Sequence, residues 1–386
     1  MTKTAVVIGG GIAGTVAAIA LHRAGWEPEI HEARAEDADE RGAFLTLAEN
    51  GLAALRLLGL DPAEVMAAGY PTPRLLLGNG AGRHLADLPL GGSGTDGTTT
   101  TTIRRGDLYA ALRAAAVEDG IPIRYGHKLA GLDGGVATFA NGDRAAGDLV
   151  VGADGLHSRT RKILDPGAPG PRYLGVLNVA GFTAGPIDAD LDPTPGVVHM
   201  TFGRRSFFGW SLDPAGSAWW FANPPAKRPH TGAPPAGYRQ TMIDLFAGDA
   251  TPAAAIIRAT PEVLGPWNTY DLPRVPVWHD DRTVLLGDAA HAASPSSGQG
   301  ASMAIEDAVT LGRCLASSSS IADGLADYEQ MRRKRVQKVV AAGRRNGSGK
   351  AAGPIGAAIR DAMMPAMMRM LYRKGNPQAW IVDHRL

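Results

Sequence analysis

The 386-residue sequence has a single cysteine, Cys314, so it can form neither an internal disulfide nor a cluster of thiolate metal ligands. It also lacks a surplus of charge, because 39 Lys and Arg side chains balance 38 Asp and Glu for a formal net charge of +1. Such a chain has no one-signed field to attract nucleic acid or an anionic membrane. We therefore expect small-molecule partners, no nucleic-acid or membrane partner, and a cytoplasmic location.

Long hydrophobic runs and metal-binding motifs are also missing. No run approaches the roughly 18 apolar residues of a membrane-spanning helix. The apolar stretch from 5 to 21 contains a cluster of glycines, so it predicts a strand, a turn and a helix rather than a signal peptide. The ten histidines form no HExxH pair, and we expect no metal site. The length favours two intertwined domains, each with its own core.

The first motif that is present follows a β-branched strand at 4–8 and opens a helix. It reads Gly-Gly-Gly-Ile-Ala-Gly over 9–14, a GxGxxG, and a second strand at 27–31 ends at Glu32. In a βαβ unit these glycines make the turn, admit a pyrophosphate and pack the helix on the strand, while the acid accepts ribose hydroxyls. The predicted contacts with a dinucleotide cofactor are Gly9, Gly11, Ile12, Ala13, Gly14, Glu32 and Arg34.

Two further turns follow buried strands. The turn at 152–161 reads Gly-Ala-Asp-Gly-Leu-His-Ser-Arg-Thr-Arg and includes Asp154. The turn at 287–302 includes Asp288, His291 and Pro295 and enters a helix through Gly-Gln-Gly-Ala-Ser. An aspartate at a strand end can bind a polyol chain, and amides at a helix start can stabilise an electron-rich ring edge.

Together these three segments resemble the class A flavoprotein monooxygenases, the para-hydroxybenzoate hydroxylase family. The family's GADGxxSxxR motif matches throughout, and GDAAHxxxPxxGQGxNxxxEDA matches except that serine replaces asparagine at 302. The arginine of its RxxL segment corresponds to Arg105, with Arg104 as a near competitor. The resemblance implies FAD as cofactor, with contacts at Thr46, Arg105, Leu129, Asp154, Asp288, Pro295, Gly298, Gln299, Gly300, Ala301 and Ser302.

The resemblance implies an α/β fold: a Rossmann-like FAD-binding domain, a mostly antiparallel β-sheet substrate domain and a C-terminal helical segment. We expect the FAD-binding domain at 1–70, 101–170 and 275–320, the substrate-binding domain at 71–100 and 171–274, and C-terminal helices at 321–386. Aromatic side chains in alternating runs from 173 to 272 favour the antiparallel sheet, and 74–90 predicts a hairpin. The basic run 332–335 is expected to be a solvated helix face.

The family's reaction implies reduction of the flavin by NADPH or NADH, capture of O2 as a flavin hydroperoxide, and transfer of one oxygen atom. The expected reaction is hydroxylation or epoxidation of a small aromatic or polycyclic metabolite by a monomer or homodimer. Because only one GxGxxG is present, the nicotinamide is expected to visit transiently. A dehydrogenase or oxidase of the same fold and an FAD-containing protein that sequesters a ligand are the alternatives.

Few residues are candidates for the chemistry itself. Pro295 is predicted to shape the oxygen-reacting face, although an ordinary loop proline is the alternative, and His291 is expected to be a structural cap. Alternate residues of a strand face opposite sides, so either Arg205 or Arg204 could face the flavin. We prefer Arg205 as the candidate for holding a carboxylate, phenolate or enolate, and a solvated edge charge is the alternative. Trp210 and Trp219 are the remaining substrate candidates, and plain core packing would explain the tryptophans equally well.

Overall fold

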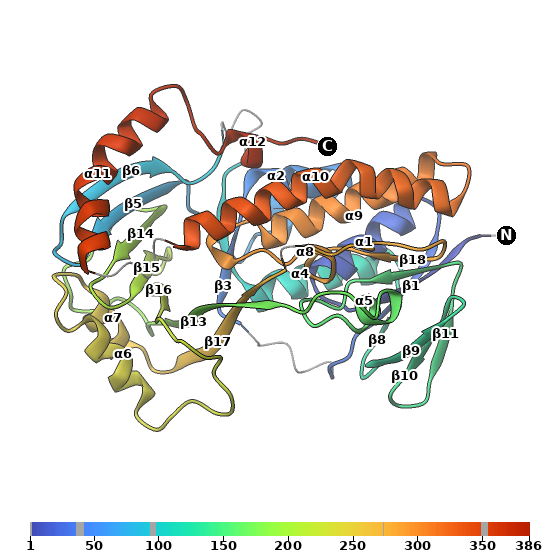
Figure 1. Ribbon diagram of the computed structural model, residues 1–386, viewed down its shortest axis with the longest axis horizontal. Coiled ribbons are helices and arrows are strands. Elements are labelled where there is room, and N and C mark those ends of the chain that lie inside the picture. The colour runs from blue at the N-terminus through green and yellow to red at the C-terminus, as the bar shows by residue number, and fades with distance from the viewer. Residues whose placement is uncertain (1, 36–41, 93–97, 273, 349–353) are drawn as a thin grey trace.

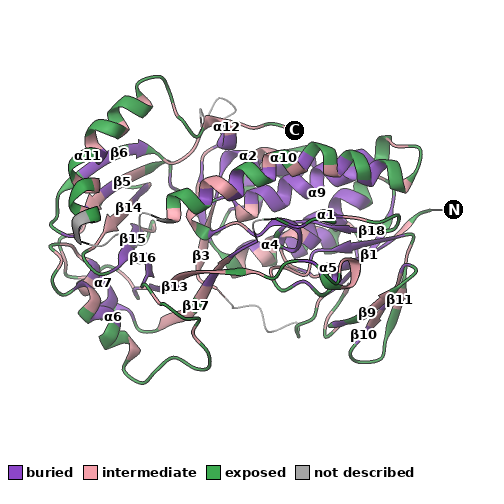
Figure 2. Ribbon diagram, viewed as in Figure 1, coloured by how far each residue is buried: buried purple, intermediate pink, exposed green. Residues whose placement is uncertain are grey.

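The computed structural model describes residues 2–35, 42–92, 98–272, 274–348 and 354–386, which form two lobes (Figure 1). One lobe contains a parallel sheet with its helices, and the other contains a larger, mostly antiparallel sheet. Strands β13 (Arg172–Phe182) and β17 (Val263–Asp271) pair with each other and run between the lobes. Figure 2 shows buried segments inside each lobe, so each lobe has its own apolar core. The predicted α/β fold class is confirmed.

The parallel sheet brings three turns to one edge of the first lobe. Its strand order is β18-β12-β1-β2-β8, and every neighbouring pair is parallel. Because parallel strands end at the same edge, the segments that follow β1, β12 and β18 emerge side by side. The five strands are β18 (Thr283–Leu285), β12 (Leu149–Gly152), β1 (Thr4–Ile8), β2 (Glu27–His31) and β8 (Ile123–Arg124).

Helices pack closely around this sheet. Helix α1 crosses α9 where Gly312 has no side chain, and a Cβ there would lie 3.0 Å from the carbonyl oxygen of Ala20. The helices of this lobe are α1 (Ile12–Arg23), α2 (Glu49–Leu57), α3 (Pro62–Val65), α4 (Arg105–Glu118), α5 (Arg159–Leu164), α8 (Asp288–His291) and α9 (Gly300–Ser317). Two small sheets complete it: β3 (Phe44–Leu47), β7 (Thr101–Arg104) and β4 (Tyr70–Pro71), then β11 (Arg144–Ala146), β10 (Val136–Phe139) and β9 (Leu129–Asp133).

The large sheet of the second lobe has the order β17-β13-β16-β15-β14-β5-β6. All of its neighbouring pairs are antiparallel except β14 with β5. The predicted hairpin is confirmed as β5 paired with β6. The remaining strands are β14 (Val197–Phe202), β15 (Phe207–Leu212), β16 (Ala218–Asn223), β5 (Arg74–Asn79) and β6 (His84–Pro89). Helices α6 (Tyr238–Phe246) and α7 (Ala253–Ala259) cover one face of this sheet.

Helix α10 (Ile321–Ser348) lies along α9 and over the 3-10 turn η1 (Pro295–Ser297) (Figure 1). A Cβ at Gly343 would lie 2.7 Å from the Cβ of Ser297, so the missing side chain permits this close approach. Beyond α10, helix α11 (Pro354–Tyr372) packs on β6, and α12 (Ala379–Val382) lies against α2. Within the described ranges, no helix is both long and apolar enough to cross a membrane.

The expectation of a solvated basic face at 332–335 is wrong for three of its four residues, since Arg332 is buried and Arg333 and Arg335 are half-buried. Arg332 is 1% exposed and forms ion pairs with Glu306 at 2.6 Å and Asp307 at 2.7 Å. Arg335 is half-buried and pairs with Glu306 at 2.7 Å. Lys334 is exposed, as expected of a charge on this helix. A run of like charges along the sequence does not reveal that a helix turns part of it towards buried carboxylates.

Candidate functional site

The three glycine turns interlock at the edge of the parallel sheet. Residue Ala153 of the second turn packs on the first, where a Cβ at Gly9 would lie 2.5 Å from its carbonyl oxygen. Arg161, which is 1% exposed, donates from Nη1 to the carbonyl of Ala289 at 2.8 Å and thus ties the second turn to the third. A Cβ at Gly287 would lie 2.9 Å from the Cβ of Ala13, so the third turn also packs on the first. The three predicted motifs therefore form one site.

The glycines of the first turn have two roles: some are required by the close packing and conformation of the backbone, and one leaves open space. A Cβ at Gly14 would lie 1.8 Å from the carbonyl oxygen of Gly9, so only glycine permits helix α1 to begin here. Gly9 itself has a φ of +105°, which side chains rarely adopt. A Cβ at Gly11, in contrast, would meet no other atom within 4 Å. The space above Gly11 and the free N–H groups of the helix start fit a pyrophosphate group.

Glu32 lies at the carboxyl end of β2, next to this turn. Its carboxylate accepts hydrogen bonds from the backbone N–H of Gly10 at 2.8 Å and of Arg34 at 3.0 Å. Arg113 of α4 donates to the carbonyl of Gly10 at 3.2 Å from Nε and 3.1 Å from Nη2. The turn is thus held from both sides, and the carboxylate lies where the second strand of a βαβ unit presents its ribose acid.

The second turn is organised by Asp154. Its carboxylate accepts from the hydroxyl of Ser158, from the backbone N–H of Arg159 at 2.8 Å, and from the N–H of Thr160 at 2.9 Å. These bonds satisfy the free N–H groups at the start of α5. The side chain predicted to contact the cofactor therefore has an evident structural role.

The carboxylate of Asp288 in the third turn and the guanidinium of Arg105 lie near enough for each charge to influence the pKa of the other. Asp288 and Arg105 are both exposed to solvent, yet desolvation is the largest influence on the pKa of each. Desolvation raises the pKa of Asp288 against the opposing effects of His291 and Arg105; Arg105, despite desolvation, has a raised pKa because of Tyr109 and Asp288. We call the surface that carries these two side chains and the open glycine positions of the turns the recess.

The segment after the third turn joins the recess to α9. Gly298 has a φ of +61°, and a Cβ at Gly298 or Gly300 would meet no other atom within 4 Å. Gln299 is buried and accepts a hydrogen bond from Asn50 at 3.0 Å. Ser302 accepts from the backbone N–H of Ala48 at 3.2 Å, so the serine that replaces the family's asparagine binds the protein itself. The backbone at Gly298 and Gly300 thus has open space beside it, which fits the edge of a flat ring.

A buried charge network supports the third turn from below. Asp307 accepts hydrogen bonds from the backbone N–H of Gly287 at 3.0 Å and from Arg332 Nε at 2.7 Å, and it also contacts His291 Nε2. The pKa of Asp307 is lowered, because His291 and Arg332 outweigh the effect of desolvation. His291 thus lies in a structural ion pair, in agreement with its expected role as a cap. The network fixes the backbone that carries Asp288.

The remaining predicted contacts lie around these turns. Thr46 hydrogen-bonds to Thr102 at 3.0 Å on β7, near the start of α4. Leu129 is buried in a cluster with Val6 and Val150 beneath the parallel sheet. Pro295 begins η1 and is exposed, and Ala301 is half-buried in the first turn of α9. Their contacts with FAD, and the effect of Pro295 on oxygen, stay predictions.

The large sheet separates the three substrate candidates. Trp210 packs with Phe208 beneath α6 and α7 and stacks on His199 at 4.1 Å between ring centroids. Trp219 lies on the other face, 5.1 Å from Phe182 and 5.8 Å from Phe44 of β3. Arg205 is exposed in the turn between β14 and β15 and donates to the carbonyl of Asp244 at 3.2 Å. Only Trp219 is thus placed against the first lobe.

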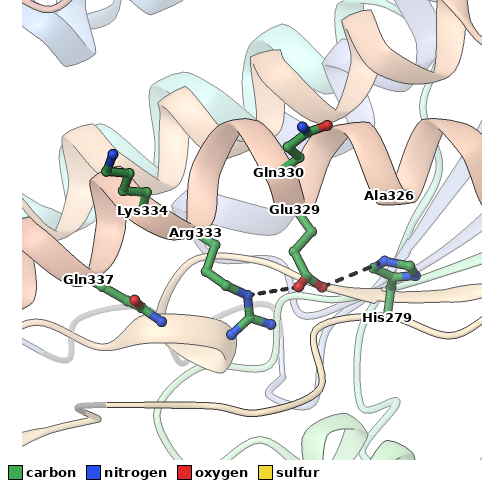
Figure 3. A pocket seen from close by; sticks show the side chains of 7 residues that line it. All are labelled: His279, Ala326, Glu329, Gln330, Arg333, Lys334 and Gln337. Carbon is green, nitrogen blue, oxygen red and sulfur yellow. Dashed lines mark hydrogen bonds and ion pairs between the residues drawn. The ribbon is translucent and has the colours of Figure 1, made fainter.

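A surface depression on α10 is separate from this site (Figure 3). In it, Glu329 pairs with Arg333 at 2.7 Å and with His279 at 3.6 Å. None of the glycine turns contributes to it; it is lined by His279, Ala326, Glu329, Gln330, Arg333, Lys334 and Gln337.

Sequence reasoning missed the arginines that hold the turns, namely Arg113, Arg161 and Arg332. Arg161 was visible as the last residue of GADGxxSxxR, but the motif did not reveal that it bonds the third turn. For Arg332 the available signal was the acidic pair Glu306 and Asp307, which occurs within an otherwise apolar stretch of α9. Buried carboxylates require a partner of opposite charge.

Replacing Asp288 with alanine is expected to weaken FAD binding by about 1.5–3 kcal/mol, or roughly ten- to a hundredfold. The change removes a desolvated carboxylate on which the charge of Arg105 acts. Titration of apoprotein with FAD, followed by flavin fluorescence, measures the effect. The exposed neighbour Asp281 provides the control, because Asp281→Ala removes the same charge without touching the recess. Equal affinity in the Asp288 variant and the wild type would contradict the assignment.

The pair formed by His31 and His127 predicts that the stability of the protein depends on pH. Desolvation lowers the pKa of His31, with help from His127, from 6.5 to about 4. The unfolded chain therefore binds one more proton between these values, so the unfolding free energy should fall by about 3 kcal/mol as pH decreases from 6.5 to 4. Urea unfolding across this range measures the slope.

His31→Phe should make the pH dependence shallower, since phenylalanine retains the stack on Phe139, whose ring lies 4.6 Å away, without a titrating group. His22→Gln, at an exposed position of α1, is the control. An unaltered slope in His31→Phe would show that other groups cause the acid sensitivity.

The chain is similar to known proteins over most of its length. A family model described as "FAD binding domain" matches residues 1–343. The aurachin C monooxygenase/isomerase of Stigmatella aurantiaca is 33% identical over 377 residues, which cover 94% of this chain and 94% of that protein. The 6-hydroxynicotinate 3-monooxygenase of Bordetella bronchiseptica is 30% identical over 358 residues, which cover 86% of this chain and 88% of that protein.

A solved structure gives the same fold. Klebsiella pneumoniae HpxO, complexed with FAD and uric acid, matches with a TM-score of 0.81 at 24% identity, over 94% of this chain and 93% of that chain. Its likeness supports the architecture, while the family match and the relatives of 30% identity or more carry the assignment. With three interlocked turns that leave open space beside Gly11, Gly298 and Gly300, the chain belongs to the class A FAD-dependent monooxygenases of the para-hydroxybenzoate hydroxylase family, and FAD is its cofactor.

Proposed function

We propose that this enzyme uses NADH or NADPH to reduce its FAD and then places one atom of O2 on a small aromatic or polycyclic metabolite. The reaction is a hydroxylation or an epoxidation. The carrying observation is that Arg105, whose charge acts on Asp288, directly follows Arg104, which lies over the rings of Phe182 and Trp219 of the large sheet. Relatives named for 6-hydroxynicotinate and aurachin C, and a structural neighbour that binds uric acid, support a ring-containing substrate.

The protein's part in this reaction is to bind and orient. FAD supplies the redox chemistry and the reaction with oxygen. Gly11 and the N–H groups of the α1 start would hold the pyrophosphate, and Asp288 would hold the ribityl chain. The N–H groups at 298–302, at the start of α9, would stabilise negative charge on the ring during reduction. We assign no protein nucleophile.

Isotope labelling tests the proposal. Protein reconstituted with FAD is supplied with NADH or NADPH, ¹⁸O2 and a panel of hydroxylated pyridine, quinoline and benzoate compounds. We expect one compound at least to stimulate NAD(P)H oxidation and to gain one ¹⁸O atom, measured by mass spectrometry of the product.

The other outcomes identify the alternatives. Oxidation of a compound without gain of ¹⁸O would indicate a dehydrogenase or oxidase. Tight binding of a compound without any turnover would indicate a protein that sequesters its ligand. Either result would contradict the monooxygenase proposal for this chain.

A further inference from the structure

Arg104 is a cation that faces aromatic rings instead of a carboxylate. Its guanidinium carbon lies 4.6 Å from the ring centroid of Phe182 and 5.3 Å from that of Trp219. Both rings belong to the face of the large sheet that meets Phe44 of β3. The side chain is exposed, and within the described part of the chain it has no hydrogen bond or ion pair.

The consecutive residues Arg104 and Arg105 place their charges on two different sides of the region where the two lobes meet. Arg105 reaches Tyr109 at 2.7 Å, and its charge acts on Asp288. Arg104, the last residue of β7, instead reaches the large sheet. Of the two competing arginines, Arg105 is therefore placed on the flavin side and Arg104 on the aromatic side.

Contact with ring faces orients Arg104 without using its hydrogen-bond donors. A guanidinium has N–H groups in a planar fork that matches a carboxylate or another anionic oxygen, and stacking on rings leaves that fork free. The carboxylate on this face, Asp213, accepts from Trp219 Nε1 at 3.1 Å and from the backbone N–H of Ser217 at 2.8 Å. It is bound to the turn that carries it and forms no ion pair with Arg104.

We propose that Arg104 anchors the substrate, and that the substrate is an aromatic ring bearing an anionic oxygen, either a carboxylate or an ionised ring hydroxyl. The guanidinium binds the anionic oxygen, while Phe182 and Trp219 hold the guanidinium and contact the ring. This inference rests on the proposed function, because it takes the reacting ring to lie between the flavin and the large sheet. It assigns to Arg104 the role that the sequence suggested for Arg205.

Ligand titration of the FAD-loaded protein, without NAD(P)H, tests this anchor. The probes are two matched pairs, 6-hydroxynicotinate with 6-hydroxynicotinamide and 4-hydroxybenzoate with 4-hydroxybenzamide, followed by the change in flavin absorbance. In the wild type we expect at least one acid to bind about tenfold or more tightly than its amide, the scale of a hydrogen bond to a charged group. In Arg104→Gln this preference should disappear, while FAD content stays at the wild-type level.

Arg205→Gln is the matched comparison, because it removes an exposed arginine whose side chain bonds to Asp244. It should keep the preference for the acid. The proposal is overturned if the wild type prefers neither acid, if Arg104→Gln keeps the preference, or if Arg205→Gln loses it. Since no electrons or oxygen are supplied, these results are independent of ¹⁸O transfer, and failure of the labelling experiment alone would contradict only the proposed function.

Discussion

Gly11→Val is expected to give a folded protein that no longer retains FAD. A Cβ at this position meets no other protein atom within 4 Å, and Gly11 has a φ of −80°, which any residue adopts. The apoprotein therefore accommodates valine. The same open space is where a pyrophosphate must approach the backbone, so a branched side chain excludes it. We expect affinity for FAD to fall more than about a hundredfold, or roughly 2.7 kcal/mol.

The substitutions Gly11→Ala and Gly14→Ala show whether the loss of FAD in Gly11→Val comes from the space above Gly11. Gly11→Ala places a single methyl group in the space and should give an intermediate affinity. Gly14→Ala places its Cβ 1.8 Å from the carbonyl oxygen of Gly9, so it should impair folding itself. Circular dichroism and urea unfolding distinguish these effects from loss of cofactor. Stoichiometric FAD in purified Gly11→Val would show that the pyrophosphate does not lie above this turn.

Arg332→Met is expected to lower the unfolding free energy by about 3–5 kcal/mol. The arginine is 1% exposed and is the partner of both Glu306 and Asp307, which are fully buried. Methionine fills much of the volume but removes the guanidinium, which leaves Asp307 with His291 and the backbone N–H of Gly287, and Glu306 with Arg335 and Asn50. Urea unfolding measures the loss. Lys334→Met on the same helix removes an exposed cation and should change stability by less than about 0.5 kcal/mol.

The loss of stability in Arg332→Met is expected to depend on pH and to become smaller as pH falls. Arginine and histidine partners lower the folded-state pKa values of Glu306 and Asp307, so these groups stabilise the protein above their unfolded values near 4 and lose that contribution as pH falls. Without Arg332 their folded pKa values rise, and protonation relieves the buried charge. The difference between variant and wild type should therefore shrink from pH 7 towards pH 4. A constant difference would mean that lost packing, rather than charge, causes the destabilisation.

The sequence predicted the flavin turns because their signals are local. Each turn follows a short apolar strand, and neighbouring parallel strands bring such turns to one edge of a sheet. Gly9 and Gly14 are required by the backbone itself, through a φ of +105° and a 1.8 Å approach, so the motif encodes geometry that one segment determines. The same reasoning applies to the hairpin of β5 and β6, whose strands are adjacent in sequence.

Features that depend on distant segments could not be read in this way. Alternation along β15 and β16 indicates that neighbouring residues lie on opposite faces, but only the packing of α6 and α7 decides which face meets the first lobe. That packing places Trp210 in the core and leaves Trp219 towards Phe44. Likewise, the burial of Arg332 depends on carboxylates 25 residues or more away, on a different helix.

A crystal structure of the FAD-loaded protein tests the central claim most directly. We predict that the pyrophosphate lies within hydrogen-bond distance of the backbone at Gly11 and Ile12, the ribityl chain beside Asp288, and one ring edge against the N–H groups of 298–302. A flavin bound elsewhere, or one whose ring lies away from the start of α9, would contradict the account.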